Sequence, residues 1–172
     1  MNILAVDTAG KTAGVALLQD DRLLYEVYLD GGMTHSETLM PMIDTCLKMC
    51  GLTCADIDLY AVNAGPGSVT GLRIGLAAVK GLAFPRETLC APVSTLEALA
   101  AAHTGEGTVL CALDARRAQV YSAAFDLATH TRLLDDDARA VTDLADFTIF
   151  HPHLIFIIRN QIKKHLFARS II

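Results

Sequence analysis

The chain has 172 residues, of which 52% are hydrophobic, so it can bury the core of one domain or of one domain and part of a second. No stretch reaches the ~18 consecutive apolar residues of a membrane-spanning helix, and the first residues lack the basic and apolar regions of a signal peptide. The five cysteines form no Cys-x-x-Cys pair, which argues against a disulfide framework and a zinc site. We therefore expect a cytoplasmic protein that has no membrane partner.

The net charge of −5 is unevenly distributed. All 19 Asp and Glu lie within residues 1–147, whereas residues 148–172 hold no acid, four bases and three of the six histidines. This last segment shows neither the period of a helix nor that of a half-buried strand. It is either a basic tail for a membrane or a nucleic acid, or a frameshift or truncation product that replaced the natural end. We favour the second interpretation because the segment continues no pattern of the preceding residues.

Residues 1–103 follow the order β-β-β-α-β-α-β-α, which is typical of a ribonuclease-H-like α/β lobe. The expected strands are residues 2–7, 12–19, 22–29, 59–64 and 89–92. The expected helices are residues 36–50, 68–83 and 94–102, with Ser36 as the N-cap of the first and Ser68 near the cap of the second.

An internal repeat begins after the linker-like residues 104–107. The segment ILAVDT at residues 3–8 resembles LCALDA at residues 110–115, and the strands that follow also correspond. We therefore predict a first lobe at residues 1–103 and an incomplete second lobe of the same type at residues 104–147. Residues 148–172 would form the atypical tail.

One candidate site is the turn after the first strand, with Asp7 and Thr8, and its repeat at Asp114. In duplicated nucleotide-binding folds of the actin, sugar-kinase and Hsp70 type, this corner holds phosphate and a magnesium-bound water. The glycine expected two residues after the Asp is Ala9 here, and the second copy lacks it too. The alternative is a carboxylate that only closes its own turn, and both interpretations remain open.

The glycine-rich segment GPGSVTGLRIG at residues 65–75 is the second candidate. It is not a Walker P-loop, because no Lys-Ser or Lys-Thr follows the glycines. The exposed N–H groups at the start of a helix could hold an anion. However, Gly67, Gly71, Gly75 and Ala78 form one stripe of small residues, which predicts the close approach of a second helix. That helix could be residues 36–50 or belong to another molecule.

The helix expected at residues 36–50 is more apolar than a single core stripe requires. Met40, Met42 and Met49 widen its apolar arc beyond the ~100° of an ordinary surface helix. Adaptable methionine surface beside a small-residue helix favours a protein interface. The alternative is a wider core.

Several blocks in fixed order resemble the TsaB family, also called YeaZ, over about residues 1–145. They are residues 3–8, 35–41, 65–75, 93–99 and 114–116. The resemblance implies an actin-like (ASKHA) fold and a non-catalytic subunit of the machinery that makes threonylcarbamoyladenosine beside the anticodon of ANN-decoding tRNAs. It implies pairing with the transferase TsaD and the ATPase TsaE, self-association when alone, and tRNA contact only through the complex.

The same resemblance places the partner-binding surface on the first-lobe helices. The implied residues are Glu37, Met40, Pro41, Asp44, Gly67, Val69, Gly71, Leu72, Gly75 and Ala78. A leucine at Gly71 or Gly75 is then expected to abolish pairing with TsaD in a chain that still folds. No tightly bound cofactor is expected, and ATP or ADP at the junction with TsaD remains open.

TsaD-like enzymes carry a His-x-x-x-His metal pair that this chain lacks. The corresponding positions are Thr95 and Leu99, and neither side chain replaces an imidazole on a metal. We therefore expect no metal site and no catalysis of the TsaD type. The alternative function class is an enzyme, either a glycoprotease-like metallopeptidase or a small actin-like ATPase.

Overall fold

The computed structural model describes residues 1–30, 34–140 and 142–143, and the backbone of residues 154–158. It divides into two compact units at Thr95 and Leu96, and each unit is described by itself. In the described residues, no helix has the length and apolar character needed to cross a membrane.

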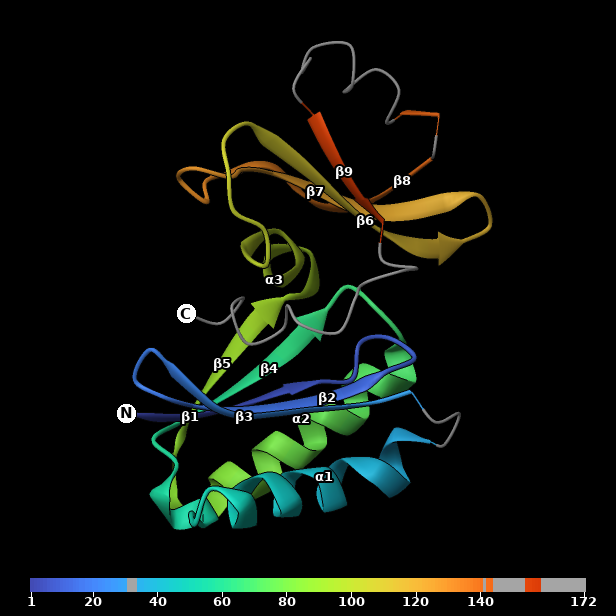
Figure 1. Ribbon diagram of the computed structural model, residues 1–172. Coiled ribbons are helices and arrows are strands. Elements are labelled where there is room, and N and C mark those ends of the chain that lie inside the picture. The colour runs from blue at the N-terminus through green and yellow to red at the C-terminus, as the bar shows by residue number, and fades with distance from the viewer. Residues whose placement is uncertain (31–33, 141, 144–153, 159–172) are drawn as a thin grey trace. The chain divides into compact units, whose positions relative to one another are not determined.

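The first unit is built on a five-stranded sheet in the order β3-β2-β1-β4-β5 (Figure 1). Its strands are β1 (Asn2–Asp7), β2 (Ala13–Gln19), β3 (Arg22–Leu29), β4 (Leu59–Gly65) and β5 (Leu89–Ser94). The first three strands pair antiparallel, whereas β4 and β5 run parallel to β1. Parallel neighbours need a crossover, and a helix before each of β4 and β5 supplies it.

Helices α1 (His35–Met49) and α2 (Val69–Ala83) lie on the same face of this sheet (Figure 1). Their buried side chains meet alternate residues of the strands, as the two-residue period of a strand requires. The core includes Leu4, Val6, Val15, Leu17, Tyr60 and Val62 from the strands and Leu39, Ile43, Cys46, Leu47 and Val79 from the helices. Two short 3₁₀ helices, η1 (Cys54–Asp56) and η2 (Phe84–Arg86), precede β4 and β5.

The helix caps agree with the sequence prediction at one helix and differ at the other. Ser68 is the N-cap of α2, and its hydroxyl accepts the N–H of Gly71 at 3.3 Å. The N-cap of α1 is Thr34, two residues before the predicted Ser36. Ser36 shares a side-chain hydrogen bond of 3.0 Å with the Thr34 hydroxyl, so it is occupied within the first turn.

The second unit contains a four-stranded sheet in the order β8-β7-β6-β9 (Figure 1). Its strands are β6 (Thr108–Arg116), β7 (Gln119–Asp126), β8 (Arg132–Ala140) and β9 (Leu154–Ile158). Three strands pair antiparallel and β9 runs parallel to β6. The arrangement repeats β3-β2-β1-β4 of the first unit, so the internal repeat in the sequence corresponds to a repeated topology.

Two features of the second unit differ from the sequence analysis. Helix α3 (Thr95–Ala101), assigned to the first lobe, buries Leu96 and Leu99 in a cluster with residues of β6 and β7. Strand β9 lies inside residues 148–172, where no continuing pattern was expected, and it pairs with β6 as β4 pairs with β1. The segment LIFII of β9 is a continuous apolar run without alternation, which explains why periodicity missed it. The rest of that segment, residues 148–153 and 159–172, lies outside the described residues.

Candidate partner-binding surface and phosphate corner

The outer side of α1 carries the predicted partner-binding residues. Glu37, Met40, Pro41 and Asp44 are all exposed, and the Met40 side chain retains 45% of its accessible surface. The Asp44 carboxylate accepts a hydrogen bond of 2.6 Å from the Lys48 ammonium group one turn later. A large apolar side chain therefore lies among acidic groups on a face that is open in this chain.

The methionines of α1 do not all belong to that face. Met49 is exposed, but Met42 is 8% exposed and lies in the main core of the first unit. The prediction that Met42 adds to the outer apolar surface is therefore wrong. Its position one residue before the buried Ile43 places it on the inner edge of the helix, so the alternative of a wider core holds at this residue.

On α2, the predicted interface residues fall into two groups. Val69 is 63% exposed, whereas Leu72 and Ala78 are half-buried. Gly71 and Gly75 are buried. Val69, Leu72 and Ala78 can therefore present side chains to another molecule. The buried Gly71 and Gly75 offer no contact area.

The glycine stripe of α2 packs on the turn that follows β1. A Cβ atom at Gly71 would overlap the carbonyl oxygen of Thr8, and one at Gly75 would overlap the Thr8 hydroxyl. At Gly67 a Cβ would lie 2.6 Å from the carbonyl oxygen of Ala9. The small residues therefore allow α2 to approach its own chain.

This packing corrects the prediction that the stripe receives a second helix. Spacing along a helix shows which residues share a face but not what covers that face. A strand end and its turn fill the stripe as well as a helix would. A leucine at Gly71 or Gly75 is accordingly expected to disturb the fold itself, and not to leave a folded chain.

The predicted phosphate corner is a turn held by hydrogen bonds within the chain. The Asp7 carboxylate accepts the N–H of Ala9 at 2.8 Å, and the Thr8 hydroxyl donates to the carbonyl oxygen of Gly71 at 2.7 Å. The N–H of Ser68 donates to the carbonyl oxygen of Ala9 at 2.8 Å. Both Asp7 and Thr8 are buried, and these hydrogen bonds close the turn and join it to α2.

His35 extends this arrangement to the start of α1. Its Nε2 atom lies 2.9 Å from the carbonyl oxygen of Gly10, in the same turn. The turn after β1 therefore contacts the first residues of α1 and α2 together. It fixes where both helices begin on the sheet, and the sequence signal for His35 was only its place in a resembling block.

The second copy of the corner has the same local bond and different surroundings. The Asp114 carboxylate accepts the N–H of Arg116 at 2.7 Å, two residues on, as Asp7 does with Ala9. Asp114 is exposed, whereas Asp7 is 5% exposed. The two carboxylates are therefore equivalent in their turns and differ in what covers them.

The two positions at which the resemblance implied a missing histidine pair lie on α3. Thr95 and Leu99 are both buried, and Leu99 belongs to the core of the second unit. Among the described residues, no group of three or more His, Cys, Asp or Glu side chains is arranged to hold a metal ion. The buried thiols of Cys46 and Cys111 are poor nucleophiles, because burial raises the pKa of each to about 12.

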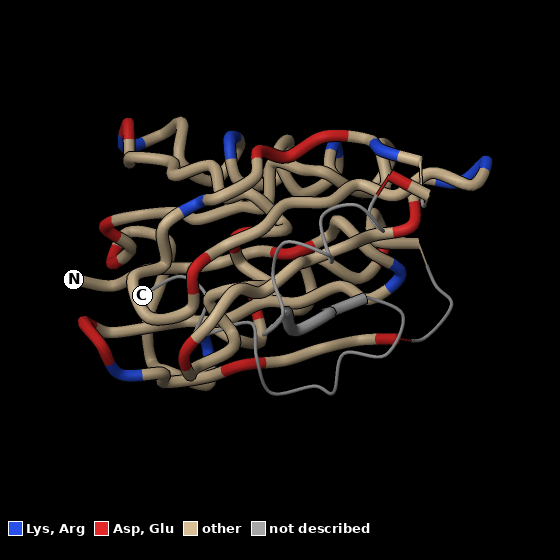
Figure 2. The backbone as a smooth tube through the Cα atoms, turned by 90° about the horizontal axis from the view of Figure 1, so that it is seen from above, with Lys and Arg blue, Asp and Glu red and all other residues tan. Residues whose placement is uncertain are grey.

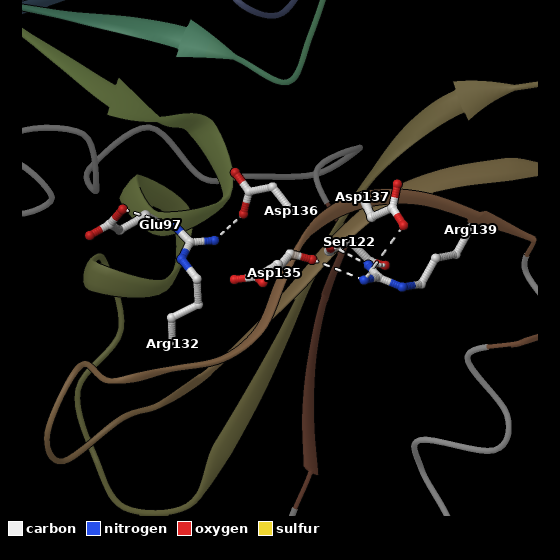
Figure 3. A network of polar contacts seen from close by, with 7 residues as sticks. All are labelled: Glu97, Ser122, Arg132, Asp135, Asp136, Asp137 and Arg139. Carbon is white, nitrogen blue, oxygen red and sulfur yellow. Dashed lines mark hydrogen bonds and ion pairs between the residues drawn. The ribbon is translucent and has the colours of Figure 1, made fainter.

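Sequence reasoning missed a polar network that ties α3 to the second sheet (Figure 3). The Arg132 guanidinium pairs with Glu97 of α3 at 3.0 Å and with Asp136 of its own strand, and it lies 4.7 Å from the ring centre of Phe125. Arg139 donates to the carbonyl oxygen and hydroxyl of Ser122 at 2.8 and 3.1 Å. The network anchors the edge strand β8, so we interpret it as structural.

Comparison with known proteins assigns the family. A family profile described as "TsaD: tRNA N6-adenosine threonylcarbamoyltransferase" matches residues 31–162. The "tRNA threonylcarbamoyladenosine biosynthesis protein TsaB" of Bacillus subtilis is 33% identical over 90% of this chain and 75% of its own length. The chain belongs to the TsaB family. The protein of the same name from Escherichia coli is 38% identical over 73% of this chain and 55% of its own length.

Solved structures support the fold of the TsaB family. "YeaZ from Pseudomonas aeruginosa" superposes with a TM-score of 0.71 and 33% identity, covering 80% of this chain and 66% of that one. A second structure, of an uncharacterised protein similar to peptidase YeaZ from the same organism, has a TM-score of 0.76 and 26% identity, covering 98% and 88%. The predicted actin-like, ribonuclease-H-like fold is therefore confirmed. The match to the Escherichia coli relative spans about half of that relative's length.

Proposed function

We propose that the chain is a non-catalytic scaffold subunit in the biosynthesis of threonylcarbamoyladenosine in tRNA. The role in this biosynthesis is supported by its relatives, which are named as TsaB proteins of tRNA threonylcarbamoyladenosine biosynthesis. The scaffold role is supported by the open outer surface of α1 and α2, which we call the helix face and define by Glu37, Met40, Val69 and Arg73. The replacement of the histidine pair by Thr95 and Leu99 supports the non-catalytic role.

The observation that carries the proposal is the composition of the helix face. Met40 and Val69 are exposed apolar side chains, one on each helix. Glu37 and Arg73 are exposed, and neither forms an ion pair with another residue in the described part of the chain. Exposed apolar side chains that a partner can bury, with charged residues around them, resemble the apolar core and polar rim of a protein interface.

We propose TsaD as the partner on this face, with TsaE joining the same assembly and tRNA bound through the complex. When TsaD is absent, two copies of the chain associate through the helix face. ATP or ADP would bind only at the junction with TsaD, and the assembly would act in the cytoplasm. An interface of ~800 Å² per partner is the ordinary size for such a pair.

The test is co-purification of tagged TsaD with a Met40→Asp, Val69→Asp double variant. Both side chains are exposed, so we expect the variant to keep its unfolding midpoint and to lose TsaD. Met49→Asp is the matched control, because Met49 is 69% exposed on the same helix but lies outside the helix face. Retention of TsaD by the folded double variant would show that the helix face is not the interface.

A catalytic role has its own test. The pure chain is incubated with ATP and Mg²⁺, or with a peptide substrate and Zn²⁺, beside an Asp7→Asn variant. We expect no turnover by either protein. Turnover by the wild type that disappears in the variant would overturn the scaffold proposal.

A further inference from the structure

Two outer strands of the sheets carry features that keep other strands away. β5 forms one edge of the first sheet and contains Pro92, which has no backbone N–H to donate. β8 forms an edge of the second sheet and carries three consecutive aspartates, residues 135–137, which Figure 2 shows as one continuous red run. Proline and charge both hinder the addition of a further strand to an exposed edge.

β3, the other edge of the first sheet, has neither feature. Its sequence, RLLYEVYL, includes no proline, glycine or lysine, and its tyrosines and valine favour strands. Leu23 and Leu29 are 43% and 36% exposed. Among the strands that the structure describes, β2 pairs with the inner side of β3 and none pairs with its outer side. An unprotected edge of this kind is a place where another strand can add to the sheet.

The regular part of β3 begins after a bulge. The register between β2 and β3 shifts at Leu24, which has no partner of its own in β2. From residue 25 to residue 29 the pairing with β2 is continuous. Within this segment, the Tyr28 hydroxyl donates to the Glu26 carboxylate. The bulge therefore disturbs only the end of β3 next to its turn, and residues 25–29 form a regular edge.

This regular edge is complementary to a second copy of itself. In antiparallel pairing about a two-fold axis at Val27, Tyr25 of one copy lies opposite Leu29 of the other, and Glu26 lies opposite Tyr28. On the side where Tyr25 and Val27 contact the core under α1 and α2, apolar residues meet apolar ones. On the other side a carboxylate meets a hydroxyl, and no like charges face each other. Two-fold pairing is the commonest symmetry of homo-oligomers, so a second copy is the occupant that fits this edge.

We propose that β3 pairs with β3 of a second copy through residues 25–29 and joins two five-stranded sheets edge to edge. In strand addition of this kind, backbone hydrogen bonds supply the affinity and the side-chain pairs fix the register. The contact goes beyond the proposed function, because it uses the edge of the sheet and leaves the helix face free. A copy whose helix face is occupied can therefore still pair with another copy.

Disulfide trapping tests the register of the two strands. Val27→Cys places one thiol at the two-fold axis, where directly opposite Cβ atoms lie ~4.5–5.5 Å apart. Leu23→Cys is the matched control, because Leu23 is 43% exposed on the same strand but lies before the bulge. Both variants also carry Cys90→Ser, which removes the exposed native thiol. With oxidised glutathione, we expect a disulfide-linked dimer from Val27→Cys and only the background level of the Cys90→Ser protein from Leu23→Cys. Equal trapping at both positions, or none at Val27, overturns the proposal.

Sedimentation equilibrium separates this contact from the helix face. In the Met40→Asp, Val69→Asp variant, which blocks the helix face, we expect a dimer to remain. Adding Leu29→Lys puts a cation on the edge twice in each interface and should weaken that dimer roughly ten-fold. Leu133→Lys is the control, because Leu133 is 47% exposed on β8, and it should leave the dimer unchanged. A monomeric double variant, or a dimer that Leu29→Lys does not weaken, overturns the proposal. Leu29→Lys alone should still co-purify with TsaD, so this proposal and the scaffold proposal fail separately.

Discussion

The two lobes open with the same turn and surround it differently. In each, an aspartate at or near the end of the first strand accepts the N–H two residues on, at 2.8 Å for Asp7 and 2.7 Å for Asp114. In the first lobe α2 covers that turn, and Asp7 is buried. In the second lobe the turn is an exposed hairpin whose tip is basic. The local motif therefore determines the hydrogen bond of the turn, whereas the elements around it determine whether the turn is buried or exposed.

The comparison shows one sequence motif in two different surroundings. The first turn organises the helix face, because Thr8 contacts α2 and Gly10 accepts from His35 of α1. The second turn has no such covering helix among the described residues and presents side chains to solvent instead. Mutations in the first turn should therefore act on stability more strongly than mutations in the exposed second turn.

The largest expected effect is at Gly71. In Gly71→Leu the new Cβ would overlap the carbonyl oxygen of Thr8, which is backbone and cannot rotate away. Such overpacking costs about 3 kcal/mol or more of unfolding free energy. Urea denaturation measures it, and the control is Gly81→Ala in the same helix, where a Cβ meets nothing within 4 Å. The control should gain ~0.5–1 kcal/mol. A Gly71→Leu protein as stable as the wild type would show that α2 does not rest on the first turn.

The next effect is at Thr8. Thr8→Val removes the buried hydroxyl that donates to Gly71, and we expect a loss of about 1–2 kcal/mol in unfolding free energy. Thr45→Val is the matched control, because its hydroxyl makes an equally short bond of 2.8 Å to Pro41 on an exposed surface. Equal losses in the two variants would mean that burial against α2 adds nothing to the bond.

The order of elements was accessible from the sequence, and so was the duplication. Hydrophobic periods located β1 to β5 and the three helices, because each element buries one face at its own period. The sequence could not predict what packs on the glycine stripe, because residue spacing shows which residues share a helix face but not which segment covers that face. For the same reason, the sequence did not show that α3 packs on β6 and β7 of the second unit. The turn between β6 and β7 was hidden for another reason. Arg117 and Ala118 adopt the left-handed conformation there, with φ angles of 53° and 58°, and they are not the residues that such turns favour.

A smaller effect on stability is expected at Arg132, which joins β8 to helix α3. Arg132→Ala removes the ion pairs with Glu97 and Asp136 and the contact with the Phe125 ring. We expect a loss of about 1 kcal/mol, since the guanidinium is partly exposed. Lys48→Ala, which breaks the exposed pair with Asp44, should cost under ~0.5 kcal/mol. If thermal denaturation shows no difference between these variants, the network in Figure 3 does not anchor α3.

The smallest effect has the opposite sign and concerns Thr95 at the start of α3. Its hydroxyl is buried and finds no hydrogen-bond partner within the described structure. A buried polar group without a partner is destabilising, so Thr95→Val should raise the unfolding free energy by up to about 1 kcal/mol. Thr38→Val is the control, because the Thr38 hydroxyl donates to the carbonyl oxygen of Thr34 at 3.3 Å and its removal should lower stability. A loss of stability in Thr95→Val would mean that the hydroxyl is engaged, and the position would then merit a search for the group that it contacts.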